Sequence, residues 1–267
     1  MPIGELVMNN VILKLAALTI VSTALVSCTE TPQMISDCES TEELTVFCGY
    51  QNPEDLAISP RGQHLIVSQF GSMDGSISGN LAISDFEGNV SIAFEGGKTI
   101  SPTTSWGSDH CPGGPAAAFS PHGLDLEKRP DGKWQLLVVN HGGRESVEYF
   151  ELSEAGDKPV LTWRGCVVMP EEIHLNDVVN MNSGGFWATH MYPRNSGVAM
   201  IRGLLGAEIG HVVQWQEGMG LTEVAGSKGA FPNGIEKSLD EKFLFVNHYI
   251  SGQTIKLEIE TDRKSVV

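Results

Sequence analysis

The sequence has few basic residues and no cluster of them. Its 267 residues include 17 lysines and arginines against 33 aspartates and glutamates, which gives a formal net charge of −16. Nucleic acid is bound through clustered lysine and arginine side chains, and a surface this acidic would repel it. Nucleic acid is therefore excluded as a partner. The acidic surface favours solubility, and it also attracts cations.

Cysteine is scarce as well, and no two of the five cysteines have the CxxC spacing typical of a zinc site. The segment CPGGP lacks the lysine and helix that follow a phosphate-binding loop. By contrast, 30 glycines and 13 prolines are spread along the chain, and the hydrophobic content of 41% is enough for a core. Many turns between short strands are typical of an all-β protein.

The N-terminus has the features of an export signal. From Met8 the sequence reads MNNVILKLAALTIVSTALVSCTE, an apolar stretch too short for a comfortable membrane span that ends in small residues before Cys28. The final LVSC resembles a bacterial lipobox, in which the cysteine carries the lipid. We expect a lipoprotein signal peptide over residues 1–27, a linker over 28–50, and an exported protein anchored through Cys28 at the periplasmic face of the outer membrane or at the cell surface. The alternative is an ordinary cleaved signal with an incidental cysteine.

Four further cysteines lie beyond this segment: Cys38, Cys48, Cys111 and Cys166. An oxidising compartment allows them to form two disulfides. Three pairings are possible, and the sequence does not choose among them.

A repeated pattern organises the rest of the chain. Each of four segments has a polar residue, an alternating strand, a turn with Gly or Asp, and a more apolar strand. They read EDLAISPRGQHLIVSQF, HGLDLEKRPDGKWQLLVVNHG, NDVVNMNSGGFWATH and NGIEKSLDEKFLFVNHY, and begin at Glu54, His122, Asn176 and Asn233, at intervals of 68, 54 and 57 residues. Repeats of this size are typical of a β-propeller, whose blades cannot bury their faces alone. A β-sandwich, the alternative, would not explain similar polar residues at equivalent points.

The four opening residues are expected to converge, because the innermost strand of each propeller blade lines the central channel. Glu54, Asn176 and Asn233 carry oxygen donors, which a hard cation such as calcium selects. A single Asn before Gly or Asp is usually a turn former. Recurrence at repeated positions favours a shared site instead.

Several motifs carry a resemblance to a known family. They are PEDLAISPRG, FSPHGLDL, LLVVNHGGRESVEYFEL, LNDVV and FPNGIEKSLDEKFLFVNHY. Together they resemble the arylesterase/paraoxonase branch of the SMP-30/gluconolactonase/LRE-like superfamily of calcium-dependent six-bladed β-propellers, from about Glu54 to about Glu258. The resemblance implies a partial β-propeller over residues 51–267, with about four blades present and the last blades and their metal ligands missing from a C-terminally truncated chain. A closed four-bladed propeller is the alternative.

The resemblance also implies two calcium sites. The ligands of a catalytic calcium would be Glu54, Asn176 and Asn233, and those of a structural calcium would be Asp55, Asp177 and the carbonyl of Leu124. Because neighbouring residues of a strand point to opposite sides, adjacent ligands can serve two sites.

Two histidines are candidates for catalysis. His122 opens a strand and His141 follows the end of the next one, so antiparallel pairing allows the two rings to meet. The resemblance implies a dyad in which one histidine is the base that activates water and the second orients it or relays its proton. The alternative is that both are structural.

The other six histidines carry weaker signals. Two of them end equivalent strands and are candidates for the pocket wall, namely His190 and His248. The remaining four are expected on the surface or in loops, namely His64, His110, His174 and His211.

These observations predict a calcium-dependent hydrolase of small-molecule lactones or aryl esters. A calcium ion with open coordination positions polarises a carbonyl and stabilises the oxyanion that forms when water attacks. Two alternatives stay open. One is a non-catalytic, calcium-stapled propeller that binds a ligand or partner at the cell surface, and the other is a sugar-lactonase.

Overall fold

The computed structural model describes residues 38–43, 45–101, 105–154, 156–259 and 263–266. The chain divides into two units, Met1–Cys48 and Gly49–Val267. In the first unit Cys38 and Cys48 form a disulfide. The expected signal peptide and Cys28 lie outside the described residues. Within the described ranges, no helix has the length and apolar character needed to cross a membrane.

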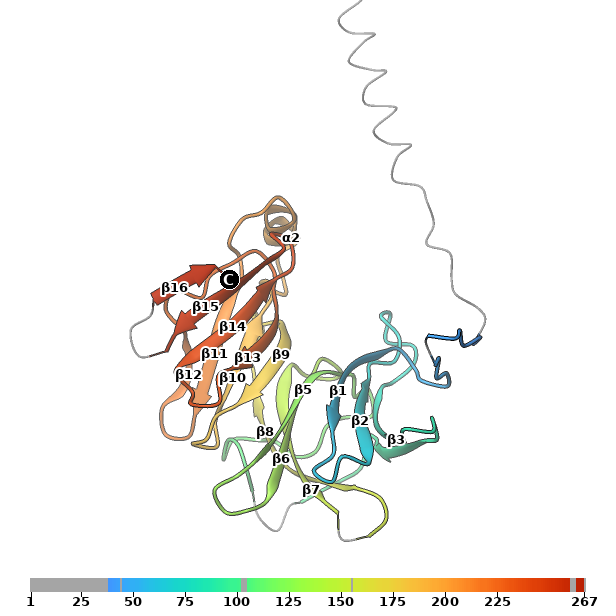
Figure 1. Ribbon diagram of the computed structural model, residues 1–267. Helices are drawn as coiled ribbons and strands as arrows, with labels where there is room; N and C mark the ends of the chain where they lie inside the picture. Colours follow the sequence, from blue (N-terminus) through green and yellow to red (C-terminus); the bar gives the residue numbers. More distant parts are fainter. Residues whose placement is uncertain (1–37, 44, 102–104, 155, 260–262, 267) are drawn as a thin grey trace, which may run out of the picture. The chain divides into compact units, whose positions relative to one another are not determined.

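The unit Gly49–Val267 contains four antiparallel sheets of four strands each (Figure 1). The first sheet is β1 (Pro53–Ile58), β2 (His64–Gln69), β3 (Asn80–Asp85) and β4 (Val90–Phe94). The second is β5 (Pro121–Lys128), β6 (Trp134–Asn140), β7 (Ser146–Ser153) and β8 (Val160–Val168). The third is β9 (Leu175–Asn180), β10 (Phe186–His190), β11 (His211–Gln216) and β12 (Gly220–Glu223), with the helix α2 (Gly197–Leu204) between β10 and β11. The fourth is β13 (Pro232–Lys237), β14 (Phe243–His248), β15 (Gln253–Glu258) and β16 (Arg263–Val266).

The sheets are arranged as propeller blades. Within each sheet the strands follow one another in chain order, and the first strands β1, β5, β9 and β13 lie next to one another in succession. The four sequence repeats coincide with the first two strands of each sheet. The prediction of an all-β propeller with about four blades in this chain is therefore confirmed.

Three apolar clusters fill the spaces between successive blades. Strand β6 explains how one sequence serves two of them. Leu136 and Val138 pack toward the first sheet, whereas Leu137 and Val139 pack toward the third. All four side chains are fully buried. Because the strand is covered on both faces, its sequence is an almost continuous apolar run.

Each innermost strand has a β-bulge close to its start. In β1 the pairing jumps from Pro53–Gln69 to Asp55–Ser68, which leaves Glu54 as the extra residue. The other three strands each place two residues opposite one, at His122–Gly123, Asn176–Asp177 and Asn233–Gly234. A bulge bends its strand and re-aims the side chains on it. Strict alternation therefore does not hold at these positions, which corrects the simple expectation that neighbours point to opposite sides.

A second disulfide holds the loop that leads into β5. Cys111 in this loop is bonded to Cys166 of β8, which is fully buried. The loop also runs along the same strand through backbone hydrogen bonds, from Trp106 N to the Arg164 carbonyl and from Ser108 N to the Cys166 carbonyl, both 3.0 Å. The structure thus selects Cys38–Cys48 and Cys111–Cys166 from the three possible pairings.

The Cys111–Cys166 disulfide is expected to contribute strongly to stability. It closes a loop with a sequence separation of 55 residues, so its removal in Cys111→Ala/Cys166→Ala should lower the free energy of unfolding by about 2–5 kcal/mol in urea denaturation. The matched control is Cys38→Ala/Cys48→Ala, which lies in the other unit and should leave this transition in place. A wild-type transition in Cys111→Ala/Cys166→Ala would contradict the expectation.

Candidate active site

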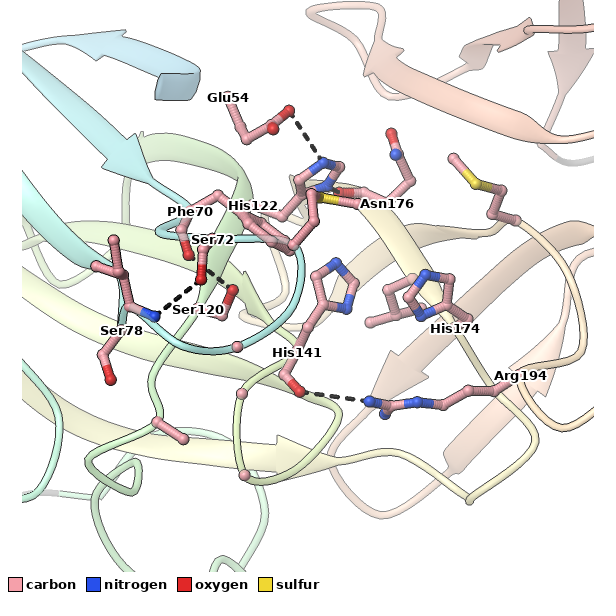
Figure 2. A pocket seen from close by; sticks show the side chains of 18 of the residues that line it. Glu54, Phe70, Ser72, Ser78, Ser120, His122, His141, His174, Asn176 and Arg194 are labelled. Carbon is pink, nitrogen blue, oxygen red and sulfur yellow. Dashed lines mark hydrogen bonds and ion pairs between the residues drawn. The ribbon is translucent and has the colours of Figure 1, made fainter. Parts of the chain in front are cut away.

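Two adjoining cavities lie at the starts of the innermost strands. The larger has a volume of about 630 Å³ and the smaller about 260 Å³. Their walls share Glu54, His122 and Asn176, each of which opens a predicted repeat. Figure 2 shows these three side chains close together beside the larger cavity.

The smaller cavity is lined by the bulge residues of all four innermost strands. They are Glu54, Asp55, His122, Gly123, Asn176, Asp177, Asn233 and Gly234. Five of the six predicted metal ligands are thus brought together. The sixth, Leu124, lies next to the cavity, and its backbone N–H donates to Asp55 Oδ2 at 2.9 Å. The roles of these residues as ligands stay predictions.

Gly123 allows strands β5 and β9 to come close at this point. A Cβ atom on Gly123 would collide with Asp177 Oδ1 and with the carbonyl of Asn176. Only glycine therefore leaves the space beside the Asp177 carboxylate open.

The two aspartates of the smaller cavity repel each other. Burial and the charge of Asp55 raise the pKa of Asp177 to about 8, even though its carboxylate accepts hydrogen bonds from Val178 N at 2.8 Å and Ile235 N at 2.9 Å. Burial also raises the pKa of Asp55. No lysine or arginine of the described ranges lines this cavity. Crowded carboxylate and amide oxygens without a lysine or arginine beside them fit a calcium ion, which would relieve the repulsion.

The larger cavity is lined by three histidine rings and by the aromatic side chains of Phe70 and Tyr192. The ring centroids of His122 and His141 are 5.2 Å apart, and those of His141 and His174 are 4.6 Å apart. Phe70 lies against both members of the first pair, at 5.8 and 5.9 Å. The first pair meets because Pro121 and Asn140, the preceding residues, are cross-strand partners. Catalysis by the pair stays a prediction.

The hydrogen bonds of His122 define the state of its ring. Its Nδ1 lies 2.8 Å from the carbonyl oxygen of Asn176, and its Nε2 lies 3.2 Å from Glu54 Oε2. Because a carbonyl oxygen can only accept, Nδ1 carries a proton.

His174 lies in a loop, as expected, but it also lines the larger cavity, which the sequence did not predict. It directly precedes β9 and has no place in the repeated pattern. His190 and His248, the candidates for the pocket wall, line neither cavity and are 3% and 4% exposed. His190 packs behind the site, where its Nδ1 accepts a hydrogen bond from His174 N at 3.1 Å.

A buried carboxylate, Glu145, was also missed by the sequence patterns. It bonds to His141, Leu175 N and Arg194, and its Oε2 lies 3.6 Å from His174 Nδ1. Burial alone would raise the pKa of Glu145, but the two histidines outweigh it and hold the pKa at about 2. No spacing rule in the sequence marks this residue, because it lies in the loop after β6.

The sequence of the chain matches a known family over most of its length. A sequence model of the Arylesterase family matches residues 76–265. The chain therefore belongs to the arylesterase family, as the motifs predicted. No curated protein matches the sequence significantly.

Several solved structures are similar to the chain. The periplasmic gluconolactonase PpgL of Pseudomonas aeruginosa is 17% identical with a TM-score of 0.45, and the match covers 82% of this chain and 57% of that one. A protein from Lactobacillus plantarum is 14% identical with a TM-score of 0.45, with 80% and 56% of the chains covered. TolB from Acinetobacter baumannii is 14% identical with a TM-score of 0.42, with 80% and 43% covered. The chain thus spans about half the length of these proteins.

Asp177 should give the metal-free protein a distinctive pH dependence. Its pKa of about 8 exceeds the usual value of 3.8, so the folded state binds more protons than the unfolded state between these values. The free energy of unfolding should therefore fall as the pH rises from about 4 to 8, by up to about 1.4 kcal/mol per pH unit. Urea denaturation with excess chelator at several pH values measures this slope.

The matched variants for this test are Asp177→Asn, which should flatten the slope, and Glu87→Gln at an exposed turn, which should leave it unchanged. A slope that persists in Asp177→Asn would show that other groups cause it.

Proposed function

We propose that this chain hydrolyses lactones or aryl esters with the help of a bound calcium ion. The observation that supports this best is the shared wall of the two cavities. Oxygen donors from three bulges face one cavity, and Glu54, His122 and Asn176 connect it to a second cavity large enough for a small substrate. Membership in the arylesterase family agrees with ester chemistry.

Glu54, Asn176 and Asn233 would hold the catalytic ion, and Asp55, Asp177 and the Leu124 carbonyl a structural one. When bound, calcium supplies a Lewis acid that polarises the substrate carbonyl and stabilises the oxyanion.

His122 would act as the general base. Its Nδ1–H is held by the Asn176 carbonyl, and once Glu54 binds calcium in place of the ring, Nε2 would take the proton from the attacking water. His141, on the same cavity wall, would orient the base or relay its proton.

The walls of the larger cavity favour a substrate with an apolar body. Phe70, Met73, Ile77, Met191 and Tyr192 supply apolar and aromatic surface around the histidines. Such walls bind the acyl or aryl part of an ester through its hydrophobic area.

Export and lipid anchoring at Cys28 belong to the same proposal. They rest on the sequence of residues 8–28, and disulfide formation supports an oxidising compartment.

The test is an assay of the full chain on a panel of lactones, aryl esters and phosphotriesters. A calcium chelator should abolish turnover, and His122→Gln should lower kcat by about 10²–10⁴ while calcium affinity is retained. His110→Gln, an exposed histidine, is the matched control and should keep full activity.

Two outcomes would contradict the proposal. Unchanged hydrolysis in excess chelator would exclude the metal mechanism. Calcium binding without turnover on any substrate of the panel would favour a non-catalytic propeller.

A further inference from the structure

The carboxylate of Glu145 is buried against the ring of His141. Glu145 has only 3% of its side chain exposed, although it lies in the loop between β6 and β7. Its Oε1 and Oε2 lie 3.1 and 3.0 Å from His141 Nδ1. This contact joins a fixed negative charge to one of the three histidines of the larger cavity.

Other groups prevent Glu145 from turning away from the ring. The backbone N–H of Leu175, at the start of β9, donates to Oε1 at 2.6 Å. The guanidinium of Arg194 donates to Oε2 at 2.9 Å. It also donates to the His141 carbonyl at 3.4 Å, and Figure 2 shows this second bond. The carboxylate is thus held in place by two hydrogen-bond donors that lie outside its own loop.

The contact determines the state of the His141 ring. A carboxylate accepts hydrogen bonds, so Nδ1 must carry the proton and Nε2 keeps the lone pair. The charged and titratable groups that face this ring are His122, His174, Glu145 and Arg194.

We propose that Glu145 is a positioning residue that fixes the orientation and the tautomer of His141 and completes a Glu145–His141–His122 series. The inference rests on the proposed function for its catalytic consequence. A buried carboxylate behind a histidine Nδ1 has the same role in many hydrolases, where it holds the ring and stabilises positive charge without accepting the proton. Because the pKa of Glu145 is about 2, the group stays ionised throughout the working pH range.

A metal ion is the competing explanation for this cluster. The ligand atoms of His141, Glu145 and His174 lie within 4.8 Å of one another, a spacing that would admit one. However, Oε2 is already bonded to the guanidinium of Arg194, whose charge repels a cation. We therefore assign none of the three residues as a metal ligand.

The test uses ¹⁵N NMR of the histidine rings in the full chain, which needs no enzymatic activity. In the wild type, His141 should carry its proton on Nδ1. In Glu145→Gln the signal should shift toward the Nε2–H form or a mixture of both. Glu148→Gln is the matched control, because Glu148 is a fully buried carboxylate three residues away that bonds to Arg144 and Trp163. It should leave the His141 signal unchanged.

The kinetic part of the test separates positioning from a structural role. Glu145→Gln should lower kcat by about 10²–10⁴ with KM within about threefold. Glu145→Asp, which keeps the charge, should recover part of kcat and part of the Nδ1–H signal. It also serves as the variant to examine if Glu145→Gln does not fold.

The outcomes distinguish this inference from the proposed function. An unchanged His141 tautomer in both Glu145 variants overturns the positioning role, and so does stoichiometric binding of Zn²⁺ that shifts the His141 and His174 rings together. Full activity of Glu145→Gln also overturns it. If the wild type hydrolyses nothing while its tautomer depends on Glu145, the proposed function fails and the positioning role stands.

Discussion

The whole arrangement depends on one extra residue at the start of each innermost strand. Because all four bulges lie at the same point of their blades, four strands present their bulge residues to one cavity. The apolar clusters between the sheets hold these strands side by side. Bulges commonly re-aim side chains at functional sites. Here three of the four bulges bring together oxygen donors that lie far apart in the sequence, and the fourth supplies His122.

This convergence has an electrostatic cost that explains the chemistry of the site. Asp55 and Asp177 are buried close enough for one to raise the pKa of the other, and Gly123 keeps the space beside them free of a side chain. A cation would offset the repulsion. His122 lies where the smaller cavity meets the larger cavity, so the same bulges that gather the donors also place the proposed base on the wall of the larger cavity.

The sequence predicted the parts of the structure that repeat. Alternation and turn residues located the first two strands of every blade, and equivalent positions marked Glu54, His122, Asn176 and Asn233. The sequence could not locate His174, Glu145 and Arg194, which lie outside the repeated strands and reach the site only through tertiary packing. The bulges and the disulfide pairing also depend on contacts between distant segments, which leave no periodic signal.

The most direct test of the account is a calcium titration of the chelator-treated full chain at pH 8 by isothermal calorimetry. The account predicts saturable binding of at least one calcium ion per chain, and the loss of that binding when Asn176 and Asp177 are both replaced by alanine. Absence of saturable binding at millimolar calcium, or unchanged binding in the double variant, would contradict the claim that the bulges build a calcium site.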